Sequence, residues 1–549
     1  MRWIARTGPV ELGLLDGPGT AGRFAAGGLT AVGEVTLHNA DALRRTVDAP
    51  PGCDDGTLLL AAYARRGLDG VAAAEGMFAL AVVDGDEVVL VRDHVGARTV
   101  FHARAGGRWA ASTSLRALRD WPALGAGLDL AAVRSFLTFA YLPGEQTLVR
   151  GVRELLPGRC LRLRPDGSSR EDVYWEPREV LDPKPAGEHA GELRALLEAA
   201  TARRLPVAEP VAVLLSGGVD SSLVTALAAK LHDQPVRTYS ISFGDELPNE
   251  LGYSGLVAAH CHTEHAVLSV PGAAVAARLP GTMALLDSPV GDPLTVPNLL
   301  LAERVAADGL TTVLNGEGGD PVFGGPKNLP MIISELHRAD PRPDARARAY
   351  LDSYRKCLAD LPALLTPEVH HALRDAPPLT DHVAPYLRQG RMTGLLNQLL
   401  HTNLRTKGAH HILTKVERLT AATGVEGRAP LFDRAVIDHA FRVPGPLKLK
   451  GATEKWILKE SVRDLLPATI VDRPKSGMRV PVQNWLDGPL SAMVADLLLS
   501  PRAATRPLFQ PATVSAWLRR EGALLPRQGG KLWLLLSLAL WLDAYDLSP

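Results

Sequence analysis

The chain has 549 residues, of which 46% are hydrophobic and 22% are charged, so it is long enough for two or more domains that each bury a core. Its 60 basic and 60 acidic residues balance, which excludes a strong electrostatic attraction to nucleic acid. The cysteines are too sparse for a disulfide scaffold and lack metal-ligand spacing; they are Cys53, Cys160, Cys261 and Cys357.

Short β-type segments separated by glycine- and proline-containing turns fill the first third of the chain, for example residues 87–91 and 160–163. Residues 177–190 are polar and contain prolines, which is typical of a linker. We therefore expect one domain at residues 1–180 and a second at residues 190–549. The N-terminus mixes apolar and charged residues at once, unlike a signal peptide, so the protein is expected to be cytoplasmic.

The most informative motif follows the apolar run at residues 211–215. Its sequence is SGGVDSS, from Ser216 to Ser222, and it leads into a helix predicted for residues 222–230. Two glycines let the backbone curl around an anion, while hydroxyl groups and the helix N-terminus supply hydrogen-bond donors. Asp220 adds a carboxylate beside the expected phosphates, which calls for a divalent cation between them. The loop lacks the lysine of a P-loop, so transfer of a terminal phosphate is disfavoured.

Strands then alternate with helices, as in a parallel sheet that is covered by helices on both faces. The predicted strands are residues 237–243 and 311–314, and the predicted helices are residues 255–260 and 299–307. A second glycine-rich corner, NGEGGD at residues 315–320, follows the later strand. Because ligands bind at the carboxyl ends of parallel strands, Asp220 and Asp320 are expected to hold one Mg²⁺ beside a polyphosphate.

From Pro326 onward the chain is predicted to be mostly helical. Lys475 lies in a proline–glycine loop, RPKSG, from which its ammonium group could reach a cleft and stabilise developing negative charge. The most apolar stretch, residues 532–542, is too short to span a bilayer and is predicted to form a buried C-terminal helix.

Taken in order, these motifs resemble the asparagine synthetase family (asparagine synthetase B-like), and the likeness covers nearly the whole chain. The segments that carry it are SGGVDSS at 216–222, DSP at 287–289 with DP at 292–293, GEGGD at 316–320 with FGG at 323–325, VEGRAPLFD at 425–433, Lys455, RPKSG at 473–477 and the apolar residues 532–542. In the N-terminal part, GMFA at 76–79, RDHVG at 92–96 and LPG at 156–158 resemble the family's glutaminase domain. The resemblance implies an α/β protein with an N-terminal Ntn-hydrolase-like αββα sandwich. A C-terminal PP-loop adenylating domain would follow, with a parallel sheet and a helical C-terminal part.

One position departs from the family pattern. Glutamine-hydrolysing members carry a cysteine directly after the initiator methionine, where it serves as nucleophile and terminal amine. This chain has Arg2 there, and its first cysteine is Cys53. We therefore expect a degenerate glutaminase that is kept as a scaffold. This places the chain near the branch that resembles β-lactam synthetases, carbapenam synthetases and lasso-peptide cyclases, in which the substrate's own amine is the nucleophile.

The resemblance implies an ATP-dependent carbon–nitrogen ligase that works through an acyl-adenylate in antibiotic or other natural-product biosynthesis, with ATP and Mg²⁺ as cofactors. Lys475 would stabilise the oxyanion, and Glu317 with Glu417 would accept the proton of the attacking amine. Leu215 and Ile241 would flank the adenine or ribose. The full set expected to hold the nucleotide is Leu215, Ser216, Gly217, Gly218, Asp220, Ser221, Ser222, Ile241, Asn315 and Gly316.

Glu317 leaves the nucleophile open. β-Lactam synthetases carry a tyrosine of a base dyad at this position, whereas asparagine synthetases carry glutamate. A separate amine or free ammonia therefore also fits as the nucleophile, and Glu317 could instead bind the substrate's amino group. The alternatives are an ammonia-dependent asparagine synthetase and, in another class, a non-catalytic scaffold on a decayed synthetase fold. Sulfur transfer to tRNA shares the loop type, but the balanced charge disfavours it.

The expected partners are a carboxylate and an amine, each on a small molecule or a peptide, with no nucleic acid and no membrane. The sequence leaves open a homodimer and association with partner biosynthetic proteins.

Overall fold

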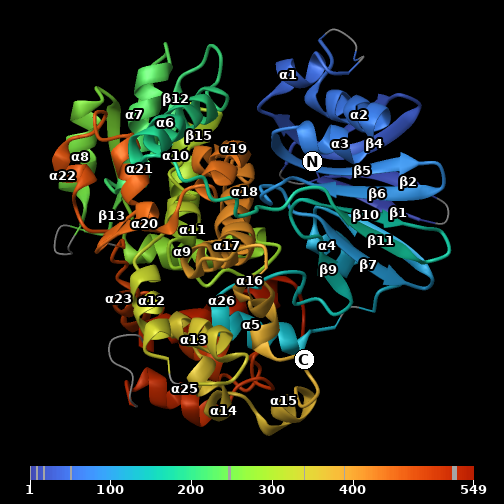
Figure 1. Ribbon diagram of the computed structural model, residues 1–549. Helices are drawn as coiled ribbons and strands as arrows, with labels where there is room; N and C mark the ends of the chain where they lie inside the picture. Colours follow the sequence, from blue (N-terminus) through green and yellow to red (C-terminus); the bar gives the residue numbers. More distant parts are fainter. Residues whose placement is uncertain are drawn as a thin grey trace.

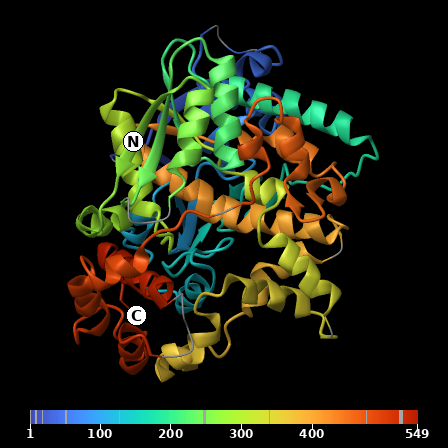
Figure 2. The same cartoon turned by 90° about the vertical axis from the view of Figure 1, so that its left-hand side faces the viewer.

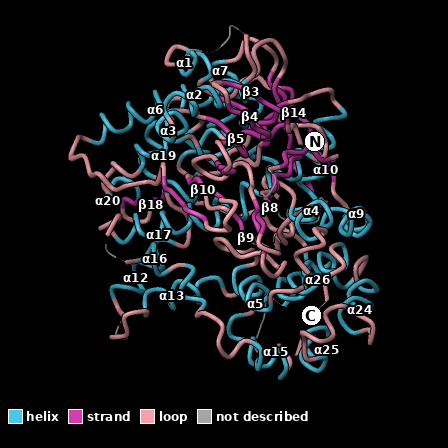
Figure 3. Tube along the Cα trace, turned by 90° about the vertical axis from the view of Figure 1, so that its right-hand side faces the viewer, coloured by secondary structure: helices cyan, strands magenta, loops and turns pink. Residues whose placement is uncertain are grey.

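The computed structural model describes residues 2–7, 10–16, 19–47, 49, 52–125, 127–244, 249–338, 340–388, 390–475, 477–521 and 528–548. Two parts that contain the large β-sheets, called the two β-rich parts below, lie side by side, and a helical part lies below them in the view of Figure 1. Figure 3 shows the same separation, since strands occupy the upper and middle regions whereas the lowest region is helical.

Two antiparallel sheets form the N-terminal part. The five-stranded sheet has the order β2-β1-β8-β7-β9, with strands Glu11–Leu15, Arg2–Arg6, Arg108–Ser112, Phe101–Ala105 and Val152–Glu154. The six-stranded sheet has the order β11-β10-β6-β5-β4-β3, with strands Ser169–Val173, Arg159–Leu163, Glu87–Arg92, Gly76–Asp84, Leu29–Leu37 and Gly22–Ala26. The strands predicted at residues 87–91 and 160–163 are confirmed as β6 and β10.

Alternation of side chains along β5 explains how these two sheets form a sandwich. Ala79 and Ala81 pack with Trp3 of β1 between the sheets, whereas Phe78 and Leu80 pack against helices on the outer face. Those helices are α1 (Ala40–Arg44), α2 (Asp55–Arg66) and α3 (Leu68–Ala73). On the far side, the five-stranded sheet packs against α4 (Leu115–Arg119), α5 (Leu130–Phe139) and helices from the end of the chain. The expected αββα sandwich is confirmed.

The second β-rich part holds a parallel sheet of order β14-β13-β12-β15-β16. Its strands are Glu264–Ser269, Val236–Ser242, Val211–Leu214, Thr312–Leu314 and Glu426–Arg428. Val211 and Val213 pack with helices on one face, and Ala212 packs on the other. The first face carries α6 (Ala186–Ala202), α7 (Val219–Leu231) and α8 (Leu251–His260), and the second carries α9 (Gly272–Leu285) and α10 (Thr295–Ala307).

The strands and helices predicted between residues 222 and 314 correspond to α7, β13, α8, α10 and β15, with boundaries that move by a few residues. The edge strand β16 was not predicted, because three residues are too few to show a periodic pattern.

The rest of the chain is mostly helical, as predicted, and Figure 2 shows the C-terminal helices (red) and residues near 330–387 (yellow) as two groups in the lower part. The helices are α11 (Gly319–Phe323), α12 (Asn328–Leu336), α13 (Ala345–Tyr354), α14 (Leu361–Leu364), α15 (Pro367–Ala372), α16 (Ala384–Leu387), α17 (Leu395–Asn403), α18 (Thr414–Ala421), α19 (Arg434–Ala440), α20 (Gly445–Lys448), α21 (Trp456–Ser461), α22 (Ala468–Val471), α23 (Val482–Asp487), α24 (Ser491–Leu499), α25 (Pro511–Leu518) and α26 (Gln528–Ala544). A π-helical segment, Leu404–Leu413, joins α17 to α18, and β17 (Leu449–Lys450) pairs with β18 (Thr453–Glu454).

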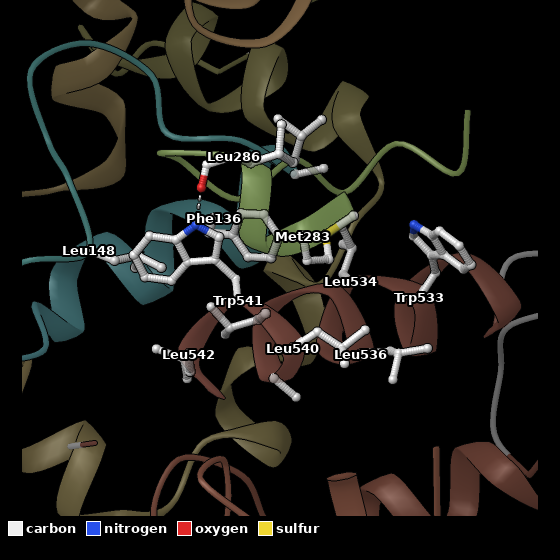
Figure 4. Packing of buried hydrophobic residues seen from close by; sticks show 14 of the residues in the cluster. Phe136, Leu148, Met283, Leu286, Trp533, Leu534, Leu536, Leu540, Trp541 and Leu542 are labelled. Atoms are coloured by element: carbon white, nitrogen blue, oxygen red, sulfur yellow. Dashed lines mark hydrogen bonds between the residues drawn. The ribbon is translucent and has the colours of Figure 1, made fainter. Parts of the chain in front are cut away.

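Helix α26 confirms the buried C-terminal helix expected at residues 532–542. Figure 4 shows Trp541 packed among Phe136 and Met283, and its indole N–H donates to the carbonyl oxygen of Leu286 at 2.9 Å. Within the described residues, no helix combines the length and the apolar character needed to cross a membrane.

Candidate active site

The SGGVDSS segment turns from β12 into α7, as expected. Gly217 has a φ of 77°, and a Cβ at this position would lie 2.7 Å from the backbone nitrogen of Ser254, so only glycine fits without a clash. The backbone N–H of Ser216 donates to Oγ of Ser221 at 3.1 Å, and the Ser221 hydroxyl donates to the carbonyl of Gly218, also at 3.1 Å. These bonds curl the backbone in front of the N-terminus of α7, an arrangement suited to anions.

The second glycine-rich corner lies directly against the first, because β15 is the neighbour of β12 in the parallel sheet. A Cβ on Gly316 would lie 2.4 Å from the backbone nitrogen of Ser221. A Cβ on Gly319 would lie 2.2 Å from a carboxylate oxygen of Asp220. Glycine therefore permits the close approach, which brings the acidic residues of the two corners together.

The two aspartates share one buried ammonium group. Nζ of Lys455 lies 2.5 Å from Oδ2 of Asp220 and 2.5 Å from Oδ1 of Asp320. Lys475 adds a second positive charge, 3.6 and 3.9 Å from the same two oxygens. Burial would raise the pKa of Asp320, but the two ammonium groups outweigh it and lower that pKa to about 2. The two ammonium groups therefore keep the Asp320 carboxylate ionised.

Lys455 belongs to the segments that resemble the family, but the sequence analysis did not place it in the site. It precedes α21 with a φ of 54°, a left-handed conformation that is strained for a side chain of this size. Strained backbone of this kind clusters at functional sites. Only the fold reveals that the side chain turns toward two aspartates far away in the sequence.

Arg473 fixes the loop that carries Lys475. Its guanidinium donates to the carbonyl of Gly217 at 3.1 Å, pairs with Glu250 and lies 3.8 Å from the ring centre of Tyr253. These contacts tie the loop to the first corner, and they explain how Lys475 comes to lie beside the aspartates.

A cavity of about 460 Å³ joins the two corners to the helical part of the protein. Lys327, Tyr354 and Asn403 line it from the helical part. The predicted site residues that line it are Leu215, Ser216, Gly218, Asp220, Ser221, Ile241, Asn315, Gly316, Glu317, Asp320 and Lys475. The structure therefore brings most of the predicted set into one cavity.

The π-helical segment and α18 contribute His411 and Lys415 to the lining of this cavity, beside Asp292. The sequence analysis assigned no role to these side chains. Nζ of Lys415 lies 2.6 Å from Oδ2 of Asp292, and Nε2 of His411 lies 3.8 Å from the same oxygen. Burial would lower the pKa of Lys415, but the charges of Asp292 and Glu317 raise it. Burial lowers the pKa of His411 to about 3, so this imidazole is neutral at pH 7. A π-helix has no periodic sequence signature, and π-helical segments are frequent at functional sites.

Glu417 does not reach the cavity, contrary to the prediction that it acts beside Glu317. Its carboxylate accepts hydrogen bonds from the backbone N–H of Thr99 at 3.2 Å and from the Thr99 hydroxyl at 2.6 Å, in the N-terminal part. The reason is helix geometry: residues two positions apart project to nearly opposite sides, and Lys415 is the one that faces the cavity.

Two further predicted site residues do not line the cavity. Gly217 forms the turn behind it, and Ser222 is completely buried on α7. Ser476, which belongs to the RPKSG motif, lies outside the described residues. The first two shape the corner rather than contact the cavity.

Arg2 takes part in an ion-pair network where the two β-rich parts meet. Its guanidinium lies 2.6 Å from Oδ2 of Asp287, and Arg418 pairs with the same oxygen at 2.9 Å.

Burial raises the pKa of Cys160 and of Cys357 to about 12, which suppresses the thiolate form that acts as a nucleophile.

The glycine corners on neighbouring parallel strands belong to a chain that is similar in sequence to ATP-dependent amide-forming ligases. The asparagine synthase family matches residues 192–543, and the glutamine amidotransferase domain family matches residues 33–175. The chain therefore belongs to the asparagine synthase family.

Similar proteins include asparagine synthetases and a beta-lactam-synthase. A putative asparagine synthetase (glutamine-hydrolyzing) of Mycobacterium tuberculosis is 28% identical over 79% of this chain and 71% of its own length. Asparagine synthetase (glutamine-hydrolyzing) 1 of Bacillus subtilis is 24% identical over 89% of this chain and 80% of its own length. A carboxyethyl-arginine beta-lactam-synthase of Streptomyces clavuligerus is 28% identical over 82% of this chain and 73% of its own length.

Proposed function

We propose that the protein adenylates a substrate carboxylate with ATP and transfers the acyl group to an amine that does not come from its own hydrolysis of glutamine. The observation that carries this proposal is the contact between the two glycine corners. One corner presents backbone and hydroxyl donors at a helix N-terminus, and the other adds a carboxylate beside it. Such a combination suits a nucleotide whose pyrophosphate is the leaving group.

In this proposal the first corner holds the phosphates. Ser216, Gly218 and Ser221 line the cavity at the N-terminus of α7, where N–H groups and the helix dipole favour negative charge. Leu215 and Ile241 line the same cavity from β12 and β13 and would contact the adenosine.

The acidic pair fits Mg²⁺. Asp220 and Asp320 already converge on one cation, the ammonium of Lys455, and Oδ1 of Asp220 is buried without a hydrogen-bond partner. Carboxylate oxygens are the ligands that Mg²⁺ prefers, and the bound ion would neutralise charge on the triphosphate. We propose that these two aspartates hold it.

The first chemical step forms a bond between a carboxylate oxygen of the substrate and the α-phosphorus of ATP, and it breaks the bond from that phosphorus to the oxygen of pyrophosphate. Lys455 and Lys475 lie where negative charge would build up on the phosphates. Fixed positive charges of this kind stabilise such a transition state without reorganisation.

In the second step the amine nitrogen bonds to the acyl carbon, and AMP leaves with the electrons of the broken carbon–oxygen bond. Lys475 would stabilise the oxyanion, and Glu317 would accept the proton from nitrogen. Lys415 and Asp292, which line the same cavity, replace Glu417 as the charged neighbours of Glu317 in this proposal.

The amine is proposed to come from the substrate or from a second substrate. The side chain of Arg2 is buried and paired with Asp287, and arginine cannot attack an amide. We propose that the N-terminal domain, at residues 1–180, serves as a scaffold for the synthetase domain at residues 190–549. The similarity to a beta-lactam-synthase supports a role in natural-product biosynthesis. We propose ring closure of the β-lactam type or of the lasso-peptide type as the reaction.

A pyrophosphate-release assay tests the proposal. Purified protein, ATP and MgCl₂ are incubated with a panel of amino acids, small carboxylic acids and peptides, with and without ammonium chloride. We expect pyrophosphate and AMP with at least one acid and no signal from Asp320→Ala. Release that depends on aspartate and ammonium would instead identify an ammonia-dependent asparagine synthetase, for which Glu317 is the favouring observation. Formation of ADP would contradict the proposed adenylation.

A further inference from the structure

A cluster of metal-ligand side chains lies away from the cavity, where α6 packs against α19. It consists of His189 and Glu192 on α6 and His439 on α19. One ligand atom from each residue lies within 4.8 Å of the other two, and in the described part of the chain no other group of three His, Cys, Asp or Glu residues does so. The cluster shares no residue with the cavity.

Hydrogen bonds fix the same tautomer in both histidines. Nε2 of His189 lies 2.9 Å from the carbonyl oxygen of Asp182, and Nε2 of His439 lies 3.2 Å from the carbonyl oxygen of His189. A carbonyl oxygen only accepts, so each Nε2 carries the proton and each Nδ1 keeps a lone pair. Metal-binding histidines show this pattern, in which one ring nitrogen donates to a carbonyl and the other binds the ion.

The Nδ1 atom of His189 gives independent evidence for a bound ligand. The side chain of His189 is fully buried, and its Nδ1 has no hydrogen-bond partner. An unpaired buried acceptor is costly unless something binds it. Nδ1 of His439 lies 3.6 Å from Oε2 of Glu192, and Oε1 of Glu192 accepts from Lys184 at 2.6 Å.

We propose that His189, Glu192 and His439 form a Zn²⁺ site that links two helices, with a water molecule as the fourth ligand. Two imidazole nitrogens and one carboxylate suit Zn²⁺, whereas Mg²⁺ and Ca²⁺ prefer oxygen ligands alone. The Glu192 side chain is 46% exposed, which leaves the site open to solvent for the ion and the water.

The site would fasten one end of the contact between α6 and α19. The other end is already tied, because Asp433 at the start of α19 pairs with Arg203 at 2.9 Å and with Arg204 at 2.8 Å, just after α6. The ion would add a cross-link at the opposite end and would also hold Asp182 through His189. Its role is stability of the synthetase part, not chemistry.

Zinc titration of the full chain tests the site. Protein treated with EDTA and dialysed is titrated with ZnCl₂ by calorimetry, and thermal unfolding is followed with ZnCl₂ or MgCl₂ in the absence of ATP. We expect one equivalent of zinc to bind and to raise the unfolding temperature, whereas MgCl₂ gives no such shift. Glu192→Gln keeps the shape of an exposed side chain and is expected to fold. It should weaken zinc binding about ten-fold or more.

Two further variants decide the result. His439→Asn should abolish the zinc-dependent shift. The double variant His370→Gln/His371→Gln removes two exposed histidines on α15 and should bind zinc like the wild type. The visible absorption of bound Co²⁺ gives a second readout that depends on ligand geometry. Absence of binding to the wild type, or equal zinc affinity in wild type and Glu192→Gln, would overturn the proposal.

Discussion

Replacement of Lys455 by methionine tests the charge cluster at the centre of the site. The Lys455 side chain is only 2% exposed, and its ammonium lies 2.5 Å from a carboxylate oxygen of both Asp220 and Asp320. Methionine retains much of the side-chain volume but removes the charge, so two carboxylates face each other with only Lys475, at 3.6 and 3.9 Å, to compensate them. Loss of one partner of a buried ion pair costs about 3–5 kcal/mol, and we expect a loss of unfolding free energy at the lower end of this range.

Urea unfolding at pH 7, followed by circular dichroism, measures this loss. Lys450→Met is the matched control, because Lys450 is exposed and its ammonium lies 4.0 Å from the ring centre of Trp456. The control should lose less than about 1 kcal/mol. MgCl₂ should stabilise Lys455→Met more than the wild type, since the uncompensated carboxylates gain a cation. A loss from Lys455→Met no larger than that of the control would refute the reasoning.

Three further predictions concern packing, pH and the interface between the two β-rich parts. Gly316→Ala places a Cβ 2.4 Å from the backbone nitrogen of Ser221 and should lower the free energy of unfolding in urea by about 1–3 kcal/mol. Gly281→Ala, whose Cβ would have no neighbour within 4 Å, is the control and should not be destabilised, so equal stability of the two variants would contradict the close contact. Burial lowers the pKa of Lys448 from 10.5 to about 7, so between these pH values the unfolded chain binds one more proton than the folded chain. The free energy of unfolding of the wild type, relative to that of Lys448→Met, should therefore rise with pH by up to about 1.4 kcal/mol per pH unit. Parallel pH profiles of the two proteins would contradict this prediction. Asp287→Asn leaves the buried side chains of Arg2 and Arg418 without their shared carboxylate and should lower the free energy of unfolding in the same assay by about 3–5 kcal/mol. A loss below about 1 kcal/mol would show that this ion-pair network is not important for stability.

The sequence was sufficient for the fold and for the parts of the site that follow directly from strand ends. Ser216 and Asp320 stand after apolar strands, and the carboxyl ends of adjacent parallel strands meet at one edge of a sheet, so local pattern and topology were enough. The C-terminal helix was equally visible, because a continuous apolar stretch of that length has to be buried.

Other residues depended on information that the sequence does not contain. The direction of Lys455 depends on a left-handed backbone conformation, and lysine is not a residue type that signals one. Glu417 was misplaced, because the motif did not reveal which face of α18 turns toward the cavity. Lys415 and Asp292 are 123 residues apart in the chain and meet only in the folded protein.

The most direct test of the central claim is a crystal structure with Mg²⁺ and α,β-methylene-ATP, which cannot release pyrophosphate. The account predicts phosphate oxygens within hydrogen-bond reach of Ser216 and Ser221, and the ion between Asp220 and Asp320. It also predicts the adenine beside Leu215 and Ile241. A nucleotide bound outside this cavity would contradict the account. So would a nucleotide bound in the cavity with its γ-phosphate, rather than its α-phosphate, facing the space that remains for the substrate carboxylate.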